Sequence, residues 1–116
     1  MPRPHNRIFV AVDTTDAVRA ADLAAAVGGW VGGVKLGKEF FTANGPQGAR
    51  RVVDAAGLPL FLDLKFHDIP NTVAAAVRAA LPLKPFMLDV HAAGGPAMMR
   101  AAAGAAAEAG ASRPLV

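Results

Sequence analysis

Four short apolar segments recur along the chain, and each is followed by a longer segment rich in alanine. The apolar segments cover residues 8–12, 34–36, 60–64 and 87–90, and their first residues lie 26 or 27 positions apart. Continuous apolar segments of this length are typical of strands covered on both faces in a parallel sheet. The pattern therefore predicts four buried strands at a regular period.

The segments between the strands have the composition and the boundary residues of helices. Proline begins three of them, at Pro46, Pro70 and Pro96, and proline suits the first helical position because no hydrogen bond is lost there. Glycine or proline ends all four. The predicted helices cover residues 16–27, 46–56, 70–81 and 96–109. Strands that alternate with helices in this way predict an α/β protein built from right-handed βαβ units.

The length of the chain suggests which α/β architecture is present. With 116 residues, 53% of them hydrophobic, residues 1–116 are expected to form a single domain. A (β/α)8 TIM barrel needs about 250 residues, so four βα units correspond to an N-terminal half-barrel. Residues 115–116 fall where the period predicts a fifth strand, so we expect the chain to be cut within that architecture. A doubly wound sheet is the alternative, but Asp13-Thr14-Thr15-Asp16 replaces the glycine-rich dinucleotide fingerprint.

Composition and charge narrow the possible location and partners. The chain contains no cysteine and no apolar segment of the roughly 18 residues that cross a membrane. We therefore expect a cytoplasmic protein without a secretory signal or a membrane partner. The net charge is +3, but the basic residues are scattered and no aromatic residues are interleaved with them, which argues against nucleic acid as a partner. A small anionic ligand such as a phosphate ester suits this charge.

Charged or titratable residues stand where the predicted strands end. In parallel α/β folds the carboxyl ends of the strands form the edge at which ligands bind. Residues from four strands therefore become candidates for one site: Asp13, Lys35, Asp63 with Lys65, and Asp89 with His91.

The third strand carries the densest group, an Asp-x-Lys-x-x-Asp cluster made of Asp63, Lys65 and Asp68. Asp63 and Lys65 are two positions apart, so on a regular strand they project to the same face. A lysine held among carboxylates can stay protonated and act as a general acid. Two structural interpretations remain open: Asp68 as a cap of the helix that begins at Pro70, and Asp63 with Lys65 as a structural ion pair.

His91 and Asp89 share one face of the fourth strand. A single histidine in a strand is often a hydrogen-bonded core residue, and this alternative to a binding role stays open. The pair lacks the additional ligands of a metal site, so the sequence predicts no metal.

Residues 32–38 match the G-x-x-x-x-G-K spacing of a P-loop, but the match is superficial. Glu39 stands where a P-loop has serine or threonine to hold magnesium. The predicted strand at 34–36 also lies inside the supposed loop instead of before it. We therefore expect no nucleoside triphosphate site here.

Residues 61–72, with the sequence FLDLKFHDIPNT, closely resemble the signature segment of the orotidine 5'-monophosphate decarboxylase family. Residues 11–13, 34–37 and 90–92 support the resemblance in order, and it covers the chain from about Arg7 to Gly110. That family has the (β/α)8 barrel that the period suggested independently.

The resemblance implies a lyase that converts orotidine 5'-monophosphate to UMP in pyrimidine biosynthesis, without metal or organic cofactor. Lys65 would protonate C6, Asp63 would lie beside the departing carboxylate, and Lys35 would hold the network and contact the ribose. Asp13 and His91 would bind substrate.

The resemblance also implies a dimer, because Asp68, Ile69 and Thr72 would reach the active site of a partner subunit. Asp68 is thereby counted among the catalytic residues. The expected partners are therefore the nucleotide substrate and a second subunit, or a complementing C-terminal half.

In the family, the residues that bind the phosphate and the pyrimidine, and the closing loop, follow the fourth unit. The chain is therefore expected to show no turnover by itself and to need a complementing half. The alternatives are an inactive half-barrel scaffold that self-associates, a nucleotide-binding module without chemistry, and a magnesium-dependent sugar-phosphate decarboxylase of the same suprafamily. Residues 66–72 argue against the last of these.

Overall fold

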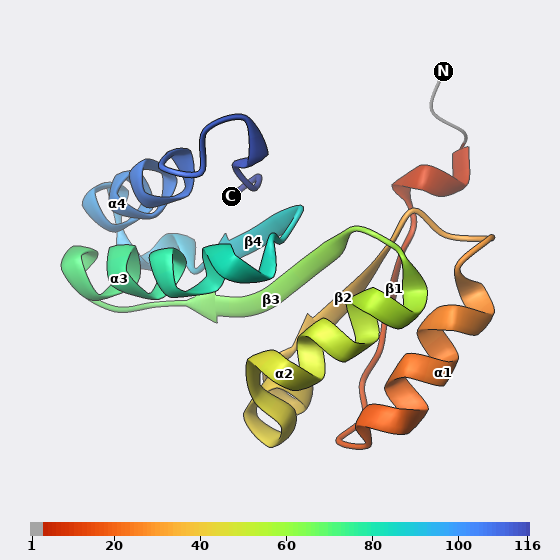
Figure 1. Cartoon of the computed structure of the whole chain (residues 1–116). Helices are drawn as coiled ribbons and strands as arrows, with labels where there is room; N and C mark the ends of the chain where they lie inside the picture. Colours follow the sequence, from red (N-terminus) through yellow and green to blue (C-terminus); the bar gives the residue numbers. More distant parts are fainter. Residues whose placement is uncertain (1–3) are drawn as a thin grey trace. The chain divides into compact units, whose positions relative to one another are not determined.

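The computed structural model describes residues 4–116 as alternating strands and helices (Figure 1). Short 3-10 turns lie at Pro4–Arg7, Leu81–Leu83, Ala92–Gly94 and Gly110–Ser112. The strands form a parallel sheet in the order β1-β2-β3-β4, which confirms the predicted α/β class. The elements are β1 (Phe9–Ala11), α1 (Ala17–Val27), β2 (Gly33–Gly37), α2 (Lys38–Ala56), β3 (Leu60–Phe66), α3 (Pro70–Ala80), β4 (Met87–Val90) and α4 (Pro96–Ala107).

The chain divides into two compact units, one ending at Asp63 and the other beginning at Leu64. Strand β3 contributes its first four residues to the first unit and its last three to the second. A single domain that includes both units stays a prediction.

In the first unit, the residues of β2 and β3 alternate between two faces. Val34 pairs with Leu60, and Leu36 with Leu62, and all four side chains are buried. Helix α2 contacts β2, and α1 packs against α2. The helices contribute small and aromatic side chains to this core, namely Ala20, Ala21 and Ala24 from α1 and Phe40, Ala49 and Val52 from α2.

The other face of the same strands carries aromatic and charged residues. Phe9 of β1 and Phe61 of β3 meet edge to face, with ring centroids 6.5 Å apart and an interplanar angle of 81°. Gly33 of β2 lies opposite Phe9 in the register, and a Cβ atom at this position would collide with the Phe9 ring. Lys35 and Asp63 belong to this face as well.

In the second unit, α3 packs against α4 through buried residues that include Val73, Val77 and Met98. At the exposed side, the Arg78 guanidinium donates to the Glu108 carboxylate, with Nε to Oε2 at 2.8 Å. The hydrogen bond from Arg78 lowers the pKa of Glu108, and the same bond raises the pKa of Arg78.

Leu115 also belongs to the second unit and pairs in parallel with Met87 of β4. The Leu88 N–H donates to the Leu115 carbonyl at 2.9 Å, and the Leu115 N–H donates to the Phe86 carbonyl at 3.0 Å. A single parallel bridge thus forms where the period predicts a fifth strand.

The predicted element bounds agree with the structure except at the second helix. That helix begins at Lys38, not at Pro46, so the predicted start is wrong. Gly45 has a φ of 64°, which breaks the helix into two parts, and Pro46 begins the second part, where its missing N–H is tolerated. Among residues 4–116, no helix is both long and apolar enough to cross a membrane.

We expect Gly33→Ala to destabilise the protein by about 1–2 kcal/mol, because the added methyl group displaces the Phe9 ring from its contact with Phe61. Gly104→Ala is the matched control, since nothing lies within 4 Å of the added Cβ and alanine favours the helix interior. Urea unfolding measures both variants. Equal midpoints for the two would contradict the packing described here.

Candidate active site

An ion pair between a half-buried lysine and a buried aspartate joins β2 to β3 in the first unit. Lys35 Nζ lies 2.9 Å from Asp63 Oδ2, within salt-bridge and hydrogen-bond distance. Asp63 is only 5% exposed, and it is the one buried charged residue in the part of the chain that the structure describes. Burying a carboxylate is costly unless an opposite charge and hydrogen bonds compensate for the lost water. Lys35 supplies the opposite charge and one hydrogen bond.

The parallel register places this pair. Lys35 lies opposite Phe61, and Asp63 lies opposite Gly37, two positions further along β2. The long lysine side chain spans that offset, while Gly37 carries no side chain that would fill it. The Val12 N–H donates to the Lys35 carbonyl at 3.0 Å. Asp13 directly follows Val12 in the chain and is exposed in the loop before α1.

Lys65, in the second unit, has an unusual backbone. Its φ is 49°, in the left-handed region that non-glycine residues rarely adopt, at a cost of about 1–3 kcal/mol. Its N–H donates to Asp89 Oδ1 of β4 at 2.9 Å, and the next residue, Phe66, accepts from the His91 N–H at 2.9 Å. The same-face prediction for Asp63 and Lys65 assumed a regular strand. That assumption is wrong at Lys65.

The segment after β3 leads into α3 without a side-chain cap. Asp68 Oδ1 accepts from the Ile69 N–H at 2.7 Å, whereas the N-cap position is Ile69 itself, with no side-chain bond. The interpretation of Asp68 as the helix cap is therefore wrong. Asp68 and Thr72 are exposed, and the apolar Ile69 is 65% exposed.

His91 follows β4 directly and is exposed, so it is not a core histidine. Its ring stacks on His67, with centroids 4.8 Å apart and an angle of 17°, and its Nδ1 accepts from the Ala93 N–H at 3.2 Å. Sequence reasoning gave His67 no role, although the signature segment contains it. The stacked His67 helps to line an open pocket of about 460 Å³ with Asp68, Ile69, Pro70, Ala93 and Gly94.

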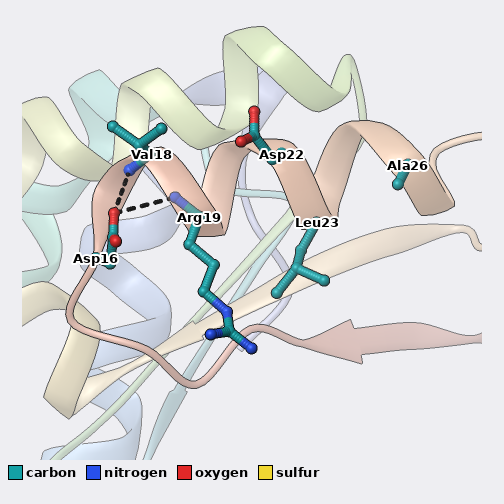
Figure 2. Close-up of a pocket in the computed structure, with 6 residues that line it drawn as sticks. All are labelled: Asp16, Val18, Arg19, Asp22, Leu23 and Ala26. Atoms are coloured by element: carbon teal, nitrogen blue, oxygen red, sulfur yellow. Dashed lines mark hydrogen bonds between the residues drawn. The ribbon is translucent and has the colours of Figure 1, made fainter.

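Another open pocket lies on α1, far along the chain from the signature segment. Figure 2 shows its six lining residues, which run from the N-cap Asp16 to Ala26. Asp16 Oδ1 accepts from the N–H groups of Val18 and Arg19, and so caps the helix. The pocket contains none of the candidate residues, so we assign it no part in the site.

Residues 4–116 contain no group of three or more histidine, cysteine or acidic side chains arranged to hold a metal ion. The structure also shows where the residues with P-loop spacing lie. Gly33–Gly37 is strand β2, and Lys38 begins α2, so the strand lies inside the supposed loop as predicted.

Residues 6–115 match the family described as "Orotidine 5'-phosphate decarboxylase / HUMPS family". The chain belongs to this family. Within the family, it is 61% identical over 101 residues to orotidine 5'-phosphate decarboxylase of Rhodospirillum rubrum, with 87% of this chain and 41% of the relative covered. It is 55% identical over 101 residues to the Paramagnetospirillum magneticum enzyme of the same name, with 87% and 43% covered.

Solved structures agree with this membership at the level of the fold. Orotidine 5'-monophosphate decarboxylase from Methanocaldococcus jannaschii, complexed with inhibitor BMP, matches with a TM-score of 0.83 at 22% identity. The match covers 88% of this chain and 47% of that one. The chain thus spans less than half the length of these relatives. The predicted class, four βα units of (β/α)8-barrel type, is confirmed.

Lys35→Met should destabilise the protein by about 1–3 kcal/mol, because the Asp63 carboxylate would stay buried without the ammonium group. Lys38→Met makes the same chemical change at an exposed position and should stay within about 0.5 kcal/mol of the unmodified protein. Urea unfolding at neutral pH compares them. If Lys35→Met is as stable as Lys38→Met, the Lys35–Asp63 pair does not contribute the stability assigned to it.

Proposed function

We propose that this chain supplies the charged catalytic residues of an orotidine 5'-monophosphate decarboxylase, a lyase that forms UMP. The observation that carries the proposal is the ion pair of Lys35 with the buried Asp63, which lies within the signature segment. The names of the relatives, all orotidine 5'-phosphate decarboxylases, support the substrate.

The proposed reaction needs a fixed anion and a proton donor. The bond between C6 and the carboxylate breaks, carbon dioxide leaves, and the electron pair stays on C6. A proton from Lys65 Nζ then replaces the carboxylate. Asp63 is the fixed anion beside the departing group, and the bond from Lys35 keeps its Oδ2 in place. Groups held in place before reaction need no reorganisation in the transition state.

Substrate binding is proposed for residues at the ends of the other strands. Asp13 is exposed at the end of β1 and can accept hydrogen bonds from ribose hydroxyls. His91 Nδ1 accepts a hydrogen bond from a backbone N–H, so Nε2 is the nitrogen that can face a ligand.

A cytoplasmic location belongs to the same proposal. The absence of cysteine from the chain is compatible with it.

A second subunit is part of the proposal. Asp68, Ile69 and Thr72 are exposed on one short segment, and the isoleucine offers a large apolar side chain at a position where a monomer gains nothing from it. We propose that this segment contacts a second copy of the chain, with Asp68 reaching its site.

The lysine assignment is tested in a chimera that joins this chain to the C-terminal region of the Rhodospirillum rubrum relative. Lys65→Ala should reduce kcat at least about 1,000-fold and change KM little, because the donor acts in the transition state. Lys84→Ala is the matched control, since Lys84 is the other lysine with a left-handed backbone and is exposed. Absorbance of the orotate ring follows turnover.

A chimera that keeps its kcat after Lys65→Ala would remove the lysine from the chemistry. A chimera that never turns over orotidine 5'-monophosphate, although folded and able to bind UMP, would contradict the proposed function. The chain by itself, measured in parallel, should show no turnover.

Ile69→Arg should shift the chain from dimer toward monomer, because it places a charge on the proposed contact. Leu23→Arg, at an exposed apolar position on α1, serves as the control and should leave the assembly unchanged (Figure 2). Sedimentation velocity over a range of concentrations distinguishes the species. Equal dissociation by both variants, or by neither, would rule out this segment as the specific contact.

A further inference from the structure

We infer that Asp89 is a positioning residue for Lys65: its carboxylate holds the lysine backbone in the left-handed conformation from which the proposed acid projects. The inference rests on the proposed function of Lys65. It comes from two features of the second unit, the positive φ of Lys65 and the hydrogen bond from its N–H to Asp89 Oδ1.

The conformation needs a local cause, because lysine gains nothing from a positive φ. In a regular parallel ladder, the N–H of a strand residue donates to a carbonyl of the neighbouring strand. At Lys65 the acceptor is a side-chain carboxylate from that strand, 2.9 Å away. One residue later the ladder resumes, where the His91 N–H donates to the Phe66 carbonyl at 2.9 Å.

Asp89 therefore lets β3 leave its regular geometry for one residue without losing a backbone hydrogen bond. A left-handed residue in a strand redirects its own side chain, as bulges do beside active sites. Strain of this kind persists only where the surroundings enforce it. Asp89 is half-buried on β4, and its carboxylate accepts the Lys65 N–H. The His91 N–H holds the next residue, because it donates to the Phe66 carbonyl.

The role assigned to Asp89 is that of a hydrogen-bond acceptor and not of a charge. Variants that keep and that remove the acceptor oxygen should therefore differ in activity. Asp89→Asn keeps the Oδ1 acceptor and should leave kcat within about 3-fold, because an amide oxygen accepts the same bond. Asp89→Leu has similar size without an acceptor and should lower kcat by about 10- to 100-fold with little change in KM. Asp54→Leu, at an exposed position of α2, is the control and should change neither.

A second measurement uses the 116-residue chain and does not depend on activity. The Lys65 Cα and Cβ chemical shifts report its backbone conformation; they should move to extended values in Asp89→Leu and stay unchanged in Asp89→Asn. If Asp89→Leu does not fold, Asp89→Ala takes its place.

Lys65 shifts that stay left-handed without the acceptor would overturn the inference. An active chimera in which Asp89→Asn and Asp89→Leu are equally impaired would also overturn it, since charge would then be what matters. If the unmodified chimera lacks decarboxylase activity, the proposed function fails, and the chemical shifts still decide whether Asp89 holds the backbone.

Discussion

The buried carboxylate of Asp63 is the constraint on which the arrangement of the site depends. A charge at 5% exposure must be compensated, and the Lys35 ammonium at 2.9 Å compensates it. This compensation requires β2 and β3 to be parallel and in one register, with Lys35 two positions before the residue opposite Asp63. The apolar residues on the reverse of the same strands, such as Leu36 and Leu62, fix that register by packing into the core. The core and the candidate site thus lie on opposite faces of the same pair of strands, β2 and β3.

The regular features of the fold could be predicted from the sequence because they repeat. Apolar segments at a period of about 26 residues located all four strands, and proline at the first helical position located the helix starts at Pro70 and Pro96. The second helix was misjudged because Gly45-Pro46 is a valid helix start, and here it begins the second part of a kinked helix instead of the whole. Local residue preferences cannot distinguish these two cases, since the turns before Gly45 are held by tertiary contacts such as the buried Phe40.

The site was less predictable than the fold, for a physical reason that can be named at each residue. Charged residues at the strand ends identified Lys35 and Asp63 as candidates, but the sequence did not show that they pair with each other. The left-handed backbone of Lys65 depends on a carboxylate 24 positions away in the chain, and lysine itself gives no sign of it. The same holds for the stack of His67 on His91, which depends on how β3 and β4 end. Each of these features is created by contacts between strands.

The central proposal is that Asp63 and Lys65 both act on the reacting carbon of a bound pyrimidine nucleotide. A crystal structure of the chimera with UMP bound tests this claim most directly. The account predicts that C6 of the uracil ring lies about 3.5 Å from Lys65 Nζ. It also predicts that the Lys35–Asp63 bond is intact beside the position of the lost carboxylate. A nucleotide bound with C6 turned away from Lys65, or bound at a surface that includes neither residue, would contradict the account.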